Sequence, residues 1–446
     1  MSRRTVLFIC HNHPSVRPGG AEAYALELHK ALRDSDEFRP ILLAKSGPPM
    51  SKAQPHDGTL IAPVNKDCDE YFFFTPHHGY NGFYGTFQKK DVCTKHFHDF
   101  LTAFRPDIVH FQHTLFLGYD LIREVRNTLP HAVIVYTLHE YLPICHRQGQ
   151  MVRTENQALC LEASPRRCHE CFPNISPQAL FLRKRYIQSH FDLVDLFLAP
   201  SRFLLERYVD WGIPRDRIRF EEYGRLDPPP LVELDEDRPR TNLGYFGQFT
   251  TFKGADVVLR AMKILLQEDQ EQRGRRYIRR RNLNDPSAKG NIHLWMHGAN
   301  LDLQPETYQK EFAALLEATR ENVTMIGRYE HKDLARVIAP IDWIIVPSIW
   351  WENSPLVIQE AFQYKRPVIC SDIGGMAEKV TDGVNGLHFR VGNPHDLAAV
   401  TRRATSTPGL WDSLRAGVPE IYRMTDHVDA LTEIYHSLLQ RTLQPV

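Results

Sequence analysis

The 446-residue sequence contains no apolar run that approaches the ~20 residues of a membrane-spanning helix. It has no excess of charge of either sign, because 54 Lys and Arg residues are balanced by 54 Asp and Glu residues. No overall electrostatic field therefore favours a nucleic acid or a membrane, and nucleic acid is not an expected partner. The apolar core of the first ten residues is too short for a signal peptide, so we expect a cytoplasmic protein.

No internal repeat, long low-complexity tract or dinucleotide-binding G-x-G-x-x-G pattern is present, and the last absence argues against an NAD domain. The 42% apolar and 24% charged residues are typical of a globular protein, and the length suggests two domains. Strand and helix patterns alternate in both halves. We predict a first α/β domain over residues 1–225, a proline- and acid-rich linker over 226–240, and a second α/β domain over 241–424.

The most informative segment begins with an apolar strand, Trp343 to Pro347, which leads into a loop that carries Glu352. Ser354 and Pro355 predict a helix start, with Ser354 as the cap and Pro355 at the first helical position. Glu360 then lies about one and a half turns into the helix. A helix start can hold phosphate, so carboxylates before and behind it could contact both ends of a sugar nucleotide. A solvated helix face is the alternative.

The pattern continues with a strand at Arg366 to Ser371, a turn and helix start at Gly374 and Gly375, and a strand at Leu387 to Arg390. We expect Gly375 to leave room for a ligand to approach the backbone. This order of elements is half of a doubly wound sheet, in which ligands bind at the carboxyl ends of strands.

These motifs resemble the donor-binding end of retaining GT-B glycosyltransferases of family 4, whose pattern is matched by Glu352, Glu360, Gly374, Gly375 and Glu378. The resemblance implies an α/β GT-B fold with two Rossmann-like doubly wound domains facing a cleft, and a C-terminal helix within 425–446 that packs back onto the first domain. Many members have Phe-Gly after the first Glu. Here Asn353, Ser354 and Pro355 follow it, so the amides of Ser354 and Leu356 would take over the role of the Gly amide.

The resemblance also implies roles for single residues in donor binding. Lys253, in a Gly-x-x-x-x-x-Lys-Gly motif, would neutralise the diphosphate, with help from Arg328. Gln248 stands where the family usually has Arg, and it can donate a hydrogen bond without charge. Glu360 would accept hydrogen bonds from the ribose.

In the first domain, Gly19 and Gly20 belong to a Gly-Gly-Ala-Glu signature that would bring backbone amides to the sugar-phosphate. A tight turn that needs positive φ is the other interpretation of these glycines. His139 resembles the family histidine close to the transferred sugar, although a lone His at a strand end can be structural. Glu352 would lie near the sugar and stabilise oxocarbenium charge. His139 and Glu352 are therefore the catalytic candidates.

The implied activity is transfer of a sugar from a UDP- or GDP-linked donor to an acceptor hydroxyl, with retention of configuration. The acceptor could be a glycan, a lipid-linked or a small molecule, as in surface polysaccharide or glycolipid synthesis. No Asp-x-Asp pair is placed to carry a divalent ion, so no cofactor is expected for catalysis. A sugar-nucleotide epimerase and a catalytically inactive sugar-binding or scaffold protein are the alternatives.

Four cysteines, Cys145, Cys160, Cys168 and Cys171, lie in one segment downstream of His139. Cys168 and Cys171 form a C-x-x-C pair, a spacing that lets two thiolates hold one tetrahedral metal ion. In a cytoplasmic setting this favours a structural zinc site over disulfides. Free thiols and redox pairing are the alternatives.

Two further segments allow more than one interpretation. Residues 272–289 carry six arginines, which could contact an anionic lipid surface or could simply be solvated. The first possibility is the basis for an expected peripheral membrane contact. The aromatic segment Tyr71 to Phe87 could provide sugar platforms in the first domain, or it could belong to the core or a lid.

Overall fold

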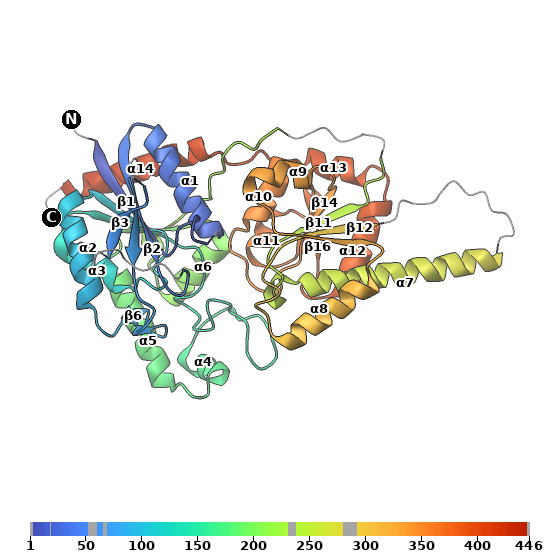
Figure 1. The fold of residues 1–446 in the computed structure, drawn as a ribbon, viewed down its shortest axis with the longest axis horizontal. Helices are drawn as coiled ribbons and strands as arrows, with labels where there is room; N and C mark the ends of the chain where they lie inside the picture. Colours follow the sequence, from blue (N-terminus) through green and yellow to red (C-terminus); the bar gives the residue numbers. More distant parts are fainter. Residues whose placement is uncertain are drawn as a thin grey trace. The chain divides into compact units, whose positions relative to one another are not determined.

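The computed structural model describes residues 3–17, 19–51, 60–65, 69–230, 238–279 and 292–443. The chain forms two compact units (Figure 1). Unit 1 comprises Met1–Leu226 and Tyr422–Val446, and unit 2 comprises Asp227–Ile421. Both are built on largely parallel sheets with helices in the connections, so the predicted α/β class is confirmed.

Among the described residues, unit 1 contains an eight-stranded sheet with the order β10-β9-β8-β7-β1-β2-β4-β3. All neighbours are parallel except β3 and β4. The central strands are continuous apolar runs, as expected for strands that are covered on both faces. The strands are β1 (Arg4–Cys10), β2 (Phe38–Ser46), β3 (Ile61–Pro63), β4 (Glu70–Phe74), β7 (Ile108–Phe111), β8 (Val133–Thr137), β9 (Leu196–Ala199) and β10 (Ile218–Phe220), with a small hairpin of β5 (Tyr80–Asn81) and β6 (Thr86–Phe87).

The C-terminal helix belongs to unit 1, where it packs beside α1 (Figure 1). The Tyr435 hydroxyl lies 2.7 Å from Nδ1 of His110, and Nε2 of His427 lies 2.6 Å from the Tyr24 hydroxyl. The helices of this unit are α1 (Gly20–Asp34), α2 (Asp91–Phe104), α3 (Asp120–Thr128), α4 (Pro165–Cys171), α5 (Pro177–Phe191), α6 (Arg202–Trp211) and α14 (Met424–Leu443).

Unit 2 has a six-stranded parallel sheet, in its described part, with the order β13-β12-β11-β14-β15-β16. The strands are β11 (Asn242–Phe246), β12 (His293–His297), β13 (Val323–Gly327), β14 (Trp343–Val346), β15 (Val368–Ser371) and β16 (Gly386–Phe389). The helices are α7 (Ala255–Arg279), α8 (Glu306–Ala318), α9 (Leu334–Ile338), α10 (Leu356–Gln363), α11 (Gly374–Lys379), α12 (Pro394–Ser406) and α13 (Leu410–Ala416).

Two predicted segments extend beyond the described residues. Residues 280–289 of the arginine-rich segment and residues 231–237 of the predicted linker lie outside them. Within the described ranges, no helix is long and apolar enough to cross a membrane. In the aromatic segment, Phe73 and Phe87 are buried and belong to the core, and Phe73 stacks on Phe97 with ring centroids 6.2 Å apart.

Candidate active site

A partly buried ion pair lies at the carboxyl edge of the unit 2 sheet. Because β11 and β14 are adjacent and parallel, the loops that follow them meet at this edge. The first loop brings Lys253, the second brings Glu352, and the Lys253 Nζ lies 2.6 Å from the Glu352 Oε1. The backbone N–H of Ile349 donates to the carbonyl of Phe252 at 2.9 Å and ties the loops together. Two predicted site residues, 99 positions apart, are thus in direct contact.

Glu352 is held by two more donors. The hydroxyl of Ser348 and the indole N–H of Trp350 donate to the same carboxylate oxygen at 2.7 Å and 2.9 Å. Burial acts to raise the pKa of Glu352, but the charge of Lys253 and the hydrogen bonds from Lys253, Ser348 and Trp350 lower it below its usual value. Glu352 is therefore a fixed negative charge at neutral pH.

The sequence analysis did not identify Trp350. Its ring stacks on Phe252 with centroids 5.7 Å apart, and the Lys253 Nζ lies 5.5 Å from the Trp350 ring centroid. Trp350 therefore contacts both members of the ion pair, by a hydrogen bond and by a cation–π contact. The sequence does contain a signal for this residue, because Trp350 and Trp351 directly precede the motif residue Glu352.

Two glycines let main chain approach main chain at this site. Gly254 has φ +66°, and a Cβ atom there would lie 2.1 Å from the carbonyl oxygen of Pro347. At Gly375 a Cβ atom would lie 1.5 Å from the carbonyl oxygen of Asn353, and the Gly375 N–H donates to the Glu352 carbonyl at 3.0 Å. The prediction that Gly375 makes room for a ligand is therefore wrong, because the Glu352 loop occupies that space.

The start of α10 differs from the prediction by one residue. Pro355 is the N-cap with extended backbone, and the first helical residue is Leu356. Proline cannot donate an N–H, so its place before the first turn costs no hydrogen bond. Ser354 is buried beside this start.

Glu360 lies in α10 with its side chain 11% exposed, and its Oε1 is 3.3 Å from Nε2 of the exposed His331. Arg328 follows β13, is exposed, and donates to the side-chain oxygen of Asn300 at 3.0 Å. Gln248 follows β11 and is exposed. Gln248 and Arg328 lie in loops that follow strands of the unit 2 sheet, and Glu360 lies in the helix that follows β14. Ligands of parallel α/β sheets bind at this end of the strands.

In unit 1, His139 follows β8 and both of its ring nitrogens are engaged. Nδ1 lies 2.6 Å from the Tyr223 hydroxyl, and Nε2 lies 2.9 Å from the side-chain oxygen of Gln112. Burial, followed by the charge of His11, lowers the pKa of His139 to about 3. The ring is therefore neutral at physiological pH and held in one orientation.

A second pair lies at the end of β1, where His11 Nε2 is 3.1 Å from Glu22 of the Gly-Gly-Ala-Glu signature. Gly19 is the N-cap of α1 with φ −157°, and Gly20 is the first residue of that helix. Neither glycine has positive φ, so the tight-turn interpretation is wrong. A Cβ atom at Gly19 would lie 2.4 Å from Oε2 of Glu22, so its glycine leaves space for that carboxylate.

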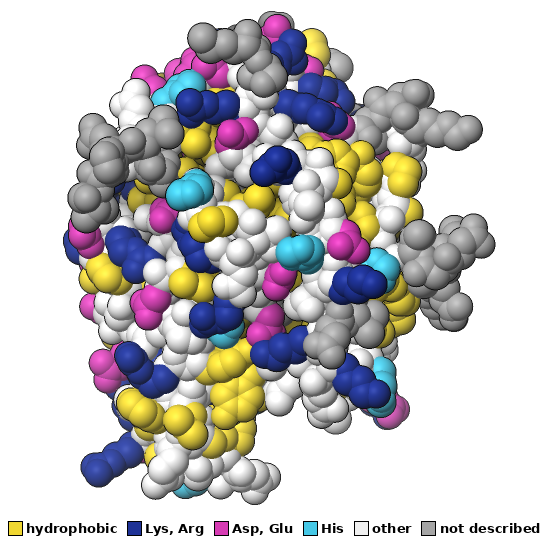
Figure 2. All heavy atoms as spheres, turned by 90° about the vertical axis from the view of Figure 1, so that its left-hand side faces the viewer, with side chains coloured by type: hydrophobic (Ala, Val, Ile, Leu, Met, Phe, Trp, Pro, Cys, Tyr) yellow, Lys and Arg dark blue, Asp and Glu magenta, His cyan; other side chains and the backbone are white. Residues whose placement is uncertain are grey.

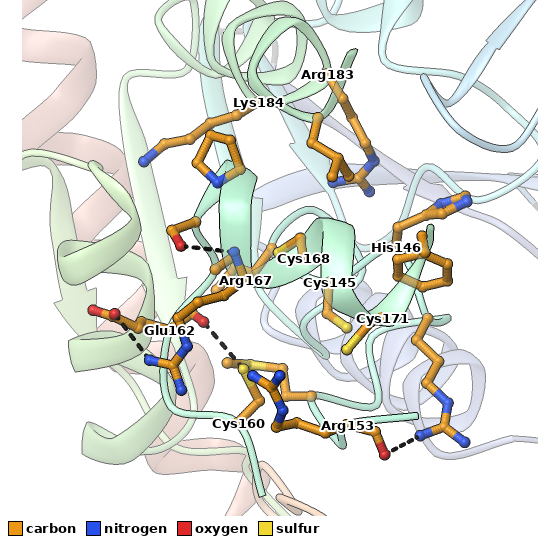
Figure 3. Close-up of a pocket in the computed structure, with 18 of the residues that line it drawn as sticks. Cys145, His146, Arg153, Cys160, Glu162, Arg167, Cys168, Cys171, Arg183 and Lys184 are labelled. Carbon is orange, nitrogen blue, oxygen red and sulfur yellow. Dashed lines mark hydrogen bonds and ion pairs between the residues drawn. The ribbon is translucent and has the colours of Figure 1, made fainter. Parts of the chain in front are cut away.

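The four cysteines Cys145, Cys160, Cys168 and Cys171 line one cavity in unit 1 (Figure 3). None is in a disulfide. Within the described ranges, however, no three His, Cys, Asp or Glu side chains are arranged so that they could hold a metal ion. The thiol of Cys160 instead contacts the carbonyl oxygen of Glu162 at 3.1 Å. The structure therefore does not provide the zinc site that the C-x-x-C spacing predicted.

From this arrangement we expect the chain, purified without a histidine tag, to contain less than about half an equivalent of zinc. Elemental analysis measures the metal, and counting thiols with a coloured reagent in denaturant provides the control for oxidation. A full equivalent of zinc, with thiols that react only after a chelator is added, would contradict this expectation and restore the zinc hypothesis.

Two family comparisons cover both units. Residues 18–220 match the family described as Glycosyltransferase Family 4, and residues 233–416 match Glycosyl transferases group 1. The chain belongs to glycosyltransferase family 4. A related family member is the D-inositol 3-phosphate glycosyltransferase of Nocardioides sp. strain JS614, 27% identical over 64% of this chain and 59% of that protein. The D-inositol 3-phosphate glycosyltransferase of Nocardia farcinica is 30% identical, over 56% of this chain and 50% of the length of that protein.

Solved structures confirm the GT-B fold of this family 4 chain. Sucrose-phosphate synthase from Thermosynechococcus elongatus matches with a TM-score of 0.69 and 16% identity, covering 98% of this chain and all of that one. Anabaena HepE in complex with UDP and glucose matches with a TM-score of 0.63 and 14% identity over the same shares. At these identities the likeness establishes the fold alone.

Proposed function

We propose that this family 4 chain is a retaining glycosyltransferase, which moves a sugar from a UDP- or GDP-linked donor to an acceptor hydroxyl. The partly buried pair of Lys253 and Glu352 is the observation that carries the proposal. It places a cation and a fixed anion 2.6 Å apart at the sheet edge where nucleotides bind. The UDP complexes of Anabaena HepE support UDP as the first donor to test.

Lys253 and Glu352 have complementary tasks in this proposal. The diphosphate gains negative charge as it leaves, so a lysine ammonium beside it lowers the barrier. The anomeric carbon gains positive charge, which the Glu352 carboxylate stabilises. Ser348 and Trp350 keep Glu352 in place when Lys253 turns toward the phosphate, because their hydrogen bonds do not depend on the lysine.

The other donor contacts follow from the same edge of unit 2. Glu360 accepts hydrogen bonds from the ribose, and the amides of Ser354 and Leu356 reach the phosphate at the start of α10. Arg328 and Gln248 provide a further cation and a neutral donor at the diphosphate.

In unit 1, we assign Gly19 and Gly20 to backbone contacts with the sugar-phosphate. His139 contacts the transferred sugar as a neutral imidazole. The acceptor is a glycan, a lipid-linked molecule or a small molecule, as in the synthesis of surface polysaccharides or glycolipids. The reaction takes place in the cytoplasm and needs no cofactor.

A donor screen by thermal shift tests the proposal. A donor present at about 100 times its Kd stabilises the folded state by about 2.7 kcal/mol, which raises the Tm by roughly 3 °C when the whole chain melts in one step and by roughly 5–10 °C when unit 2 melts separately. We expect this rise in Tm with one UDP- or GDP-sugar, and a smaller rise with the nucleobase of that donor alone. If no sugar nucleotide shifts the Tm, the donor-site assignment fails.

The selected donor then separates the possible activities. A transferase releases nucleoside diphosphate only when an acceptor is present. An epimerase converts the donor without an acceptor, and an inactive sugar-binding protein does neither.

A further inference from the structure

Helix α5 of unit 1 and the segment before α4 expose large apolar side chains. The exposed fraction is 52% for Phe181 and 56% for Leu182, and Leu161, just before α4, is 51% exposed. Phe181 and Leu182 line an open apolar groove with Pro165 of α4 and Pro177 of α5. We call Pro165, Arg166, Pro177, Phe181, Leu182 and Arg185 the α4–α5 surface.

The exposure of this surface is built into the fold. Arg183, the next residue in α5, is 5% exposed and donates to the carbonyls of Phe83, Leu142 and Pro143 at 2.7 Å each. These three hydrogen bonds fix the rotation of α5 about its axis. Phe181 and Leu182 are therefore held outward, away from the buried face that carries Leu180, Arg183 and Ile187.

The same segment is strongly basic in a chain whose total charge is zero. Residues 164–191 contain five Arg and Lys residues and one acidic residue, Glu170. Arg183 is buried and Arg167 pairs with Glu162, so Arg166, Lys184 and Arg185 supply the accessible positive charge. Glu170 pairs with Arg153 outside the segment. Helix α5 itself carries no acidic residue, and the arginines at 166 and 185 are exposed beside the apolar pair. Figure 2 shows the face on the left-hand side of Figure 1. In its lower part, at the height of α5, hydrophobic side chains (yellow) and Lys and Arg side chains (dark blue) lie close together.

This combination fits one kind of partner. Two or three exposed apolar side chains are too few for the core of a stable protein interface, which buries about 800 Å² per partner. A second copy of the chain would bring the same positive charge and be repelled. A bilayer with anionic lipids accepts the apolar side chains between headgroups and attracts the surrounding arginines.

We propose that the α4–α5 surface docks unit 1 on an anionic membrane. Phe181 and Leu182 enter the boundary between headgroups and acyl chains, and Arg166 and Arg185 contact lipid phosphates. This surface is distinct from the arginine-rich segment at 272–289. The proposal does not depend on the sugar or the donor.

Vesicle flotation of the full chain, without any donor, tests the proposal. We expect binding to phosphatidylcholine vesicles that contain about one third phosphatidylglycerol, and little binding to pure phosphatidylcholine. Phe181→Ser/Leu182→Ser should weaken binding by at least about tenfold, because the apolar contribution is lost. Arg166→Ala/Arg185→Ala should weaken it by about 25-fold, since each basic side chain contributes roughly fivefold.

Control variants carry comparable changes in unit 2. Val384→Ser alters an aliphatic side chain that is 50% exposed, and Lys310→Ala/Arg320→Ala removes one exposed charge within α8 and one just after it. These variants should bind like the unmodified chain. The proposal is overturned if the unmodified chain does not float, if the controls lose as much, or if the Phe181/Leu182 variant binds normally. It is also overturned if light scattering shows self-association that this variant abolishes while vesicle binding is absent.

Discussion

Lys253→Ala is expected to weaken sugar-nucleotide binding by roughly a hundredfold. A charge-assisted hydrogen bond in a partly buried site contributes roughly 1.5–3 kcal/mol, and each 1.4 kcal/mol is tenfold in affinity. Here the loss is enlarged, because Glu352 stays buried next to the incoming diphosphate and now repels it. Isothermal calorimetry with the donor found by thermal shift measures the change. Lys332→Ala, which alters a lysine of unit 2 that is 76% exposed, is the matched control.

Loss of folding must be separated from loss of binding in this variant. Lys253 lowers the pKa of Glu352 in the folded state, and this pair adds stability that is present above the unfolded pKa and is lost as the pH falls. Lys253→Ala should therefore melt earlier at pH 7, and the difference should shrink at acidic pH. Lys253→Ala/Glu352→Gln removes the unpaired charge and should recover part of the Tm without restoring full affinity. Unchanged affinity in Lys253→Ala and in Glu360→Ala would remove the donor-site assignment.

His139→Ala is expected to lower turnover at least tenfold, with donor affinity nearly unchanged. Its proposed partner is the reacting sugar, so its contribution belongs to the transition state rather than to nucleotide binding. A tenfold loss corresponds to 1.36 kcal/mol. Because the pKa of His139 is lowered to about 3, this group does not titrate near neutral pH. The loss should therefore be the same across neutral pH.

Two further variants help to distinguish a catalytic role of His139 from a purely structural one. His131→Ala changes an exposed histidine just before β8 and should leave both parameters unchanged. Tyr223→Phe removes the hydroxyl that lies 2.6 Å from His139 Nδ1, and it should reproduce part of the turnover loss if orientation of the ring matters. Turnover of His139→Ala within about twofold of the unmodified chain would show that His139 only supports the fold.

The strands of unit 2 were predictable because a parallel sheet covered on both faces requires continuous apolar runs. Trp343 to Pro347 was predicted as a strand, and β14 ends at Val346. The second predicted strand, at Arg366 to Ser371, contains β15, whose four residues are all buried. Motif spacing likewise indicated Lys253 and Glu352, which the fold brings into contact.

The details of the site depended on contacts that a single sequence does not encode locally. The donors Ser348 and Trp350 reach Glu352 through the shape of their loop, which spacing does not specify. His139 is oriented by Gln112 and Tyr223, which lie 27 and 84 residues away.

Two predictions from local sequence patterns, the start of α10 and the metal site of the four cysteines, differ from the structure. Ser354 has a capping side chain, yet the helix starts one residue later, after Pro355. The four cysteines share a cavity, but the described residues do not bring three of them into a metal-binding arrangement.

The approach of Gly375 to the Asn353 carbonyl has a consequence for how this enzyme can be altered. The Glu352 loop rests directly on the main chain of α11. At 375 even a single methyl group would push the two backbones apart.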